Sequence, residues 1–197
     1  RVEAIQPLLE KTGLSELSEL FSAVKAEEAD FAGGLDELEQ LNADFREAHD
    51  RFKAAEKAAS GFLLNLDFPE GIPADQDTTT RFEQQTRRFE LSQRQEDIIG
   101  TAKLALAARD AEELKSSADA LEKLNAGIDA PELGISAQAQ DTLERHITQM
   151  ADSLSTLAEL SDRRSALSGK MNSLYQDFIA KMHTLGGQLE SKLADDA

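Results

Sequence analysis

The sequence has no cysteine and no tryptophan, one tyrosine, and four prolines among 197 residues. Without cysteine the chain forms no disulfide, offers no thiolate to a metal and has no cysteine nucleophile. Four prolines and 11 glycines supply little of the turn chemistry that a protein of many short strands needs. These absences favour long helices over a β-sandwich or barrel.

The chain also lacks an apolar run near the ~20 residues that cross a bilayer, and it opens at Arg1 on amphipathic sequence rather than a signal peptide. We therefore expect a piece of a larger protein. The formal net charge of -17 is spread along the chain and repels phosphate backbones and anionic lipids, so nucleic-acid binding is not expected.

What is present is a 40% hydrophobic fraction, mainly Leu, Ala and Phe, which is typical of helices packed along seams. We predict an all-α, elongated, antiparallel up-down helical bundle that forms a single domain over 1–197. Three long helices are visible. Four-helix modules are expected, either one module or two stacked.

Two breaks separate the periodic segments. Pro69 and Pro73 mark the first break, and Thr80-x-x-Glu83 is a capping-box pattern that begins the next helix. Pro131 marks the second, with Ser136 as the N-cap of the last helix. The predicted segments are a helical region over 1–62, a loop over 63–79, a helix over 80–126, a turn over 127–135 and a helix over 136–194.

The first helical region has two readings. Its apolar residues keep one phase across Gly33-Gly34, which favours one long helix, kinked or straight. The alternative is a tight helical hairpin at the glycine pair, which makes a four-helix bundle. Residues 1–12 are expected to form a short separate helix or the remnant of a longer one.

Apolar residues at three-four spacing define a seam on each helix. The predicted core residues are Leu17, Phe21, Val24, Phe31, Leu38, Phe45, Phe52, Ala59 and Phe62; then Phe82, Phe89, Leu104, Ala107, Ala111, Leu114, Ala118 and Leu121; then Leu143, Ile147, Met150, Leu154, Leu157, Leu167, Met171, Leu174, Phe178, Met182, Leu185 and Leu189.

The seams of two helices, the one over 80–126 and the one over 136–194, become polar part-way along. Folding the helix over 80–126 onto the last helix about residue 131 sets Gln93 opposite about residue 169 and Asp97 opposite about residue 165, to within one turn of ~5.4 Å. We therefore predict a polar layer in mid-bundle, with Arg51, Arg87, Arg88 and Arg163 nearby. Its members are Arg46, His49, Gln93, Arg94, Asp97, Ser161, Arg164 and Ser168.

This polar layer has a structural and a functional reading. In the first, an Arg164–Asp97 pair fixes helix register, as polar seam residues do in coiled coils. In the second, arginines in excess of their internal partners bind a small carboxylate or similar anion.

The sequence carries no pattern of an enzyme. His49, His146 and His183 are scattered without metal-ligand spacing, and no nucleophile elbow or Walker sequence is present. We predict no enzymatic activity, no metal and no cofactor.

Part of the sequence resembles a known family. The stretch Ser92-Gln-Arg-Gln-Glu-Asp-Ile-Ile, then Arg109-Asp110 and a Leu/Ala helix, is similar to periplasmic helical sensor domains of chemoreceptors and TorS-like sensor kinases of the helical bimodular type. Arg163-Arg164 with the Leu-rich tail resembles their last helix. That family needs an even number of long helices, so either a first helix is missing here or the glycine hairpin is real.

The resemblance implies an extracytoplasmic, periplasmic domain of an inner-membrane receptor, either a chemoreceptor or a sensor kinase, attached to the membrane only through flanking spans outside this sequence. It further implies a homodimer that binds a small anionic metabolite such as an organic acid, or a periplasmic binding protein, and transmits a helix shift. The alternative is a structural or adhesive helical rod that binds partner proteins and takes no small ligand.

Overall fold

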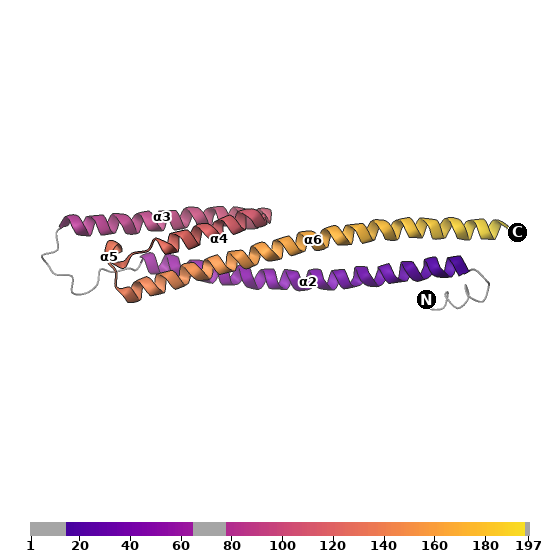
Figure 1. The fold of residues 1–197 in the computed structure, drawn as a ribbon, viewed down its shortest axis with the longest axis horizontal. Helices are drawn as coiled ribbons and strands as arrows, with labels where there is room; N and C mark the ends of the chain where they lie inside the picture. The colour runs from indigo at the N-terminus through magenta and orange to yellow at the C-terminus, as the bar shows by residue number, and fades with distance from the viewer. Residues whose placement is uncertain (1–14, 65–77, 196–197) are drawn as a thin grey trace. The chain divides into compact units, whose positions relative to one another are not determined.

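The computed structural model describes residues 15–64 and 78–195, and their side chains over 18–63 and 78–191. Every regular element described is a helix: α2 (Ser15–Leu64), α3 (Thr78–Ala108), α4 (Ala111–Ala126), α5 (Ala130–Leu133) and α6 (Ala137–Asp195) (Figure 1). The all-α bundle prediction is confirmed. The helix expected near 1–12 and most of the loop expected over 63–79 lie outside the described residues.

The helices form two compact units, which we describe separately. Unit 1 comprises Arg1–Leu41 and Arg164–Ala197, so it contains the first part of α2 and the last part of α6. Unit 2 comprises Asn42–Arg163 and contains the rest of α2 and α6 together with α3, α4 and α5. Both α2 and α6 therefore contribute to each unit.

The glycine pair does not break the first helix. Gly33 and Gly34 lie inside α2, so the reading of one long helix is confirmed and the alternative hairpin is wrong. A Cβ built at Gly34 would lie 3.2 Å from Cγ of Met171, whereas one built at Gly33 would meet nothing within 4 Å. Gly34 thus allows α6 to approach α2 closely within unit 1.

The predicted single helix over 80–126 is wrong, because the chain reverses at Arg109–Asp110. Arg109 has φ 58°, and the amides of Arg109 and Asp110 donate to the carbonyls of Leu106 and Ala105. This is a Schellman motif with arginine where glycine is usual. Asp110 then caps α4, its Oδ1 accepting from the Glu113 amide at 3.0 Å.

The reversal gives unit 2 four long helical segments. Lys103 of α3 pairs with Glu56 of α2 at 2.6 Å, and α3 packs along α4 (Figure 1). Asn125 of α4 donates to Thr148 of α6 at 3.0 Å. Phe62 of α2 meets His146 of α6 edge to face, with ring centroids 6.3 Å apart. Each helix therefore packs between two others, as in an antiparallel four-helix bundle.

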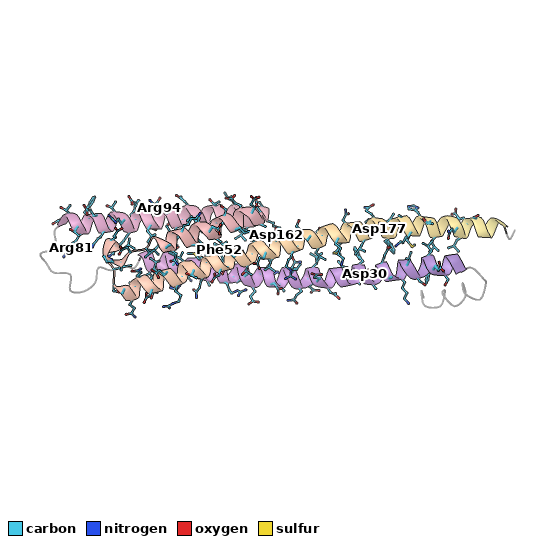
Figure 2. The ribbon with its side chains drawn as sticks, in the orientation of Figure 1. Asp30, Phe52, Arg81, Arg94, Asp162 and Asp177 are labelled. Atoms are coloured by element: carbon cyan, nitrogen blue, oxygen red, sulfur yellow. The ribbon has the colours of Figure 1, made fainter. Side chains whose placement is uncertain are left out.

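The predicted core is confirmed at Val24, Phe52 and Ala59 of α2, on α4 and on the first half of α6. The other predicted seam residues of α2 whose side chains are described are half-buried, and the predicted core residues Met182 and Leu189 of α6 are exposed. Figure 2 shows Phe52 inside unit 2, and it is 1% exposed. The fully buried side chains at predicted seam positions also include Leu114, Leu121, Leu143, Ile147, Met150, Leu154 and Leu157.

The predicted seam of α3 is wrong. Phe82, Phe89 and Leu104 are 70%, 65% and 74% exposed, and the buried face consists of Gln84, Leu91, Gln95, Ile99, Ala102 and Ala105. Both faces of α3 carry apolar residues, so spacing alone did not distinguish them. Reversal at Arg109 fixes which face meets α4.

Candidate functional site

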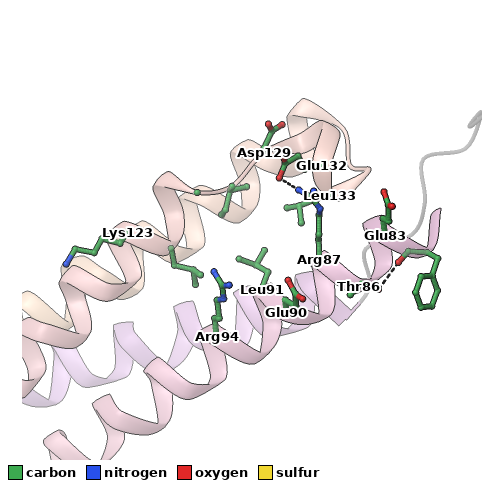
Figure 3. A pocket seen from close by; sticks show the side chains of 14 residues that line it. Glu83, Thr86, Arg87, Glu90, Leu91, Arg94, Lys123, Asp129, Glu132 and Leu133 are labelled. Atoms are coloured by element: carbon green, nitrogen blue, oxygen red, sulfur yellow. Dashed lines mark hydrogen bonds and ion pairs between the residues drawn. The ribbon is translucent and has the colours of Figure 1, made fainter. Parts of the chain in front are cut away.

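A groove opens between α3 on one side and α4 and α5 on the other, entirely within unit 2 (Figure 3). It has a volume of about 540 Å³ and an apolar floor. A neighbouring hollow of about 390 Å³ continues between α3 and α4 and shares Arg94, Lys123 and Leu124 with it. We call the two together the α3–α4 groove. Its apolar residues include Leu91, Ile98, Leu124, Ile128 and Leu133.

Hydrogen bonds from α3 to α5 close one end of the groove. Arg88 donates from Nε to the Leu133 carbonyl and from Nη2 to the Gly134 carbonyl, both at 2.6 Å. Arg87 pairs with Glu132, as the dashed line in Figure 3 marks. Burial lowers the pKa of the Arg88 guanidinium by desolvation. These bonds hold the first turns of α3 against α5.

The chain around α5 is held from the other side by α6. Gln140 accepts from the Ala130 amide at 3.0 Å and donates to the Ile128 carbonyl at 3.2 Å. Gly134 ends α5 at φ 59°, which places its backbone against the Gln84 side chain. The wall of the groove is therefore fixed by side-chain bonds to α3 and α6, which suits a preformed binding site.

The groove carries charges of both signs. Arg87 is compensated by Glu132, whereas Arg94 and Lys123 form no ion pair or hydrogen bond with any described residue. Both of these cations line both parts of the groove. Glu83, Glu90, Asp97 and Asp129 also line it. Arg94 and Lys123 therefore form the part of the groove that can receive an anion.

The structure divides the eight residues of the predicted polar layer between the two units. Arg164 and Ser168 belong to unit 1, and the other six belong to unit 2. The facing of Gln93 with residue 169 was predicted from one continuous helix over 80–126. That helix is wrong, because α3 ends at Ala108 and packs along α4.

The six residues of the predicted polar layer that lie in unit 2 also differ in solvent exposure. Arg46, Gln93, Arg94 and Asp97 are exposed, His49 is half-buried and Ser161 is 7% exposed. In unit 1 Arg164 is half-buried and Ser168 is exposed. Of the eight, the structure places Arg94 and Asp97 together in one hollow.

Lys123 was missed by the sequence reasoning. A signal for it exists: Asp110-x-x-Glu113 is a capping-box pattern, and folding the chain about that point sets Arg94 opposite about residue 125. The capping-box pattern was not recognised because the helix before it ends at an arginine, Arg109, where glycine is usual.

Within the described ranges, no group of three or more His, Asp or Glu side chains is arranged to hold a metal ion. No described helix is long and apolar enough to cross a membrane. Comparisons with protein-family models, with curated proteins and with solved structures gave no match.

Proposed function

We propose that this chain is the extracytoplasmic ligand-sensing domain of a transmembrane signalling receptor, either a chemoreceptor or a sensor kinase. Its ligand is a small organic acid bound in the α3–α4 groove. The observation that carries the proposal is that Arg94 and Lys123 lack ionic partners among the described residues and lie beside an apolar floor. A carboxylate bound there gains charge-assisted hydrogen bonds in a chain that otherwise repels anions.

The acids of the groove narrow the ligand class. Glu90 and Asp97 lie about one turn before and after Arg94 on α3. They disfavour a polyanion and favour a small acid that also carries a positive group, as an α-amino acid does. The apolar residues Leu91 and Leu124 receive the carbon chain of such a ligand.

The same helices offer a route from the groove to α6. Helix α4 forms one wall of the groove and bonds to α6 through Asn125–Thr148 and Lys115–Asp162, the latter at 3.4 Å. A ligand that changes the spacing of α3 and α4 therefore acts on α6. Packed helices move by shifts of ~1–2 Å as units, which is the kind of displacement a receptor transmits.

A thermal-shift screen against small carboxylates and amino acids tests the ligand. A binder at a hundredfold excess over its Kd adds ~2.7 kcal/mol, which raises the Tm of a chain of this size by ~5–10 °C. Arg94→Ala and Lys123→Ala should each remove most of that shift. Lys57→Ala is the matched control, since it removes an exposed cation of α2 in the same unit. A compound that still raises the Tm of both groove variants would show that the binding site lies elsewhere.

The receptor assignment has its own test, independent of the ligand. The full-length gene product should carry hydrophobic spans on both sides of this chain, and Arg94→Ala in that protein should abolish its response to the compound. Secretion or repeat signals in place of the spans would contradict the receptor.

A second candidate is a helical rod that binds partner proteins. It is favoured by the exposed apolar stripe on α3, formed by Phe82, Phe89 and Leu104. Large exposed apolar side chains in a row are typical of protein-binding surfaces. If no small molecule stabilises the chain and Phe89→Ala removes binding to a partner protein, this candidate replaces the sensor.

A further inference from the structure

The charges of the α3–α4 groove are sorted along its length. Charged side chains that line it without an ion pair or hydrogen bond to any described residue include Glu90, Arg94, Lys123 and Asp129. Arg94 and Lys123, the basic pair, line both hollows, whereas Glu90 and Asp129, the acidic pair, line only the hollow that reaches α5. Figure 3 shows the same order, with the acidic pair nearer to α5. The groove therefore has a basic part and an acidic part.

The ion pair between Arg87 and Glu132 sets the register of the two walls. Because the chain reverses between α3 and α4, a position about three residues after Arg87 lies opposite one about three residues before Glu132. This places Glu90 opposite Asp129, and the two members of the basic pair at one level to within about two residues. At ~1.5 Å per residue, the acidic pair lies roughly 6–9 Å from the basic pair along the groove.

The floor between the two pairs is apolar. Leu91 lies between them on α3, and Leu124 and Ile128 lie between them on the opposite wall. Leu91 and Ile128 are 8% and 7% exposed, and Leu124 is half-buried. A ligand that reaches both pairs therefore carries apolar groups between a negative and a positive end.

We propose, on the basis of the ligand-sensing function above, that the groove binds a short apolar peptide with free ends. Its carboxylate binds the basic pair and its α-ammonium binds the acidic pair. An extended chain spans ~3.3–3.6 Å per residue, so a peptide of two or three residues covers ~7–10 Å. A free amino acid carries both charges on one carbon and reaches one pair. A dicarboxylate or a polyamine sets a charge against another of the same sign, which is disfavoured.

The two ends of the groove differ in how much room they leave. The Arg87–Glu132 ion pair crosses between the walls about one turn beyond the acidic pair, so it closes the ammonium end. Beyond the basic pair the second hollow continues between α3 and α4, and Asp97 is the single acid among the residues that line it. A longer peptide extends into that hollow and carries its carboxylate past the basic pair. Affinity should therefore be highest for two or three residues.

Calorimetry with defined peptides is the first experiment. The probes are dipeptides, tripeptides and pentapeptides of alanine, valine, leucine and phenylalanine, beside the same four amino acids in free form. The tightest dipeptide or tripeptide should bind at least about tenfold more tightly than any of the free amino acids or the pentapeptides, because it reaches both pairs. N-terminal acetylation and C-terminal amidation of that peptide should each weaken binding at least about tenfold, since each removes one terminal charge.

Substitutions assign each end of the peptide to its pair. Arg94→Ala should weaken the free peptide about tenfold and leave the affinity of its C-terminal amide unchanged, because the amide does not use the basic pair. Glu90→Gln with Asp129→Asn should weaken the free peptide similarly and leave the N-acetyl peptide unchanged. Asp129 precedes α5 without a capping bond from its side chain, so its change to asparagine removes no bond of the fold.

The matched control is Glu96→Gln with Glu122→Gln, which removes the same charge from exposed positions of α3 and α4 outside the groove. It should bind the free peptide as the unchanged chain does. An equal loss in this control would show that net charge rather than the groove attracts the ammonium, and it would overturn the proposal. Acetylated and amidated peptides that bind as well as the free peptide would overturn it too.

The peptide ligand and the sensing function fail in different ways. If free amino acids or small carboxylates bind in the groove and none of the peptides does, the peptide ligand is refuted while the sensing function stands. If none of these compounds binds, both are refuted.

Discussion

The reversal at Arg109–Asp110 predicts opposite effects for two adjacent substitutions. Arg109→Gly should stabilise the fold by about 1 kcal/mol, because φ 58° costs a non-glycine residue ~1–2 kcal/mol and part of that gain is lost to the unfolded chain. Asp110→Ala should destabilise it by about 1 kcal/mol, because Oδ1 no longer accepts from the Glu113 amide.

If the helix were continuous through Arg109 and Asp110, both substitutions would have the opposite effect on stability. Glycine inside a helix costs ~1 kcal/mol relative to good helix formers, and alanine is a better helix former than aspartate. Ala107→Gly, two residues earlier and inside α3, is therefore the control and should destabilise the fold by about 1 kcal/mol.

The assay is urea unfolding followed by circular dichroism. A change of 1 kcal/mol moves the midpoint by ~0.3–1 M at the usual m-values. Tyr175 is the one tyrosine and lies in unit 1, so its fluorescence reports that unit separately. If Arg109→Gly lowers the midpoint and Asp110→Ala raises it, the reversal and the four-helix bundle are refuted together.

Three further substitutions, two of them paired with a control at an exposed position, test the interior of unit 2 by the same assay. Gly134→Ala should destabilise the fold by more than ~1 kcal/mol, because φ 59° disfavours alanine and the new Cβ would lie 2.4 Å from a glutamine side chain of α3. Its control is Gly100→Ala, whose Cβ would meet nothing within 4 Å and which should stabilise α3 by ~0.5–1 kcal/mol. Gln95→Leu should raise stability by ~1–2 kcal/mol, because Gln95 is 1% exposed and its side-chain oxygen has no hydrogen-bond partner among the described residues. Phe52→Ala should lower the free energy of unfolding by ~3–5 kcal/mol because Phe52 is buried, and Phe82→Ala by less than ~0.5 kcal/mol because Phe82 is exposed. Similar losses from both would show that the buried faces of α2 and α3 are wrongly assigned.

The α3 helix shows where inference from spacing fails. It has Phe82 and Leu104 on one face and Leu91 and Ile99 on the other, so either face satisfies the helical period. Helix α6 posed no such choice in its first half, where Leu143 through Leu157 form the one apolar face, and its seam there was predicted correctly.

The candidate site depended on the same choice. Arg94 was assigned to the polar layer because it lies next to the polar seam position Gln93 and at the predicted level of Arg46, yet its companions in the groove come from α4 and α5 and not from α6. A chain that folds back fifteen residues after Arg94 brings Lys123 to the level of Arg94, and one that first folds back near residue 131 brings residues near 168 to that level. The end of α3 at Arg109 therefore determines which residues line the groove beside Arg94.

Local propensity and the period within one helix were enough to predict the helical class, the continuity of α2 and α6, and the core positions of α4 and of the first half of α6. The sequence left the partner of each face undetermined, since a face is buried only by whatever packs against it. The tertiary structure was needed to show that Phe82 and Phe89 of α3 face outward, that Arg94 and Lys123 line one groove, and that the apolar face of α6 is buried in unit 2 and partly exposed in unit 1. Each of these depends on which helices pack against a given face.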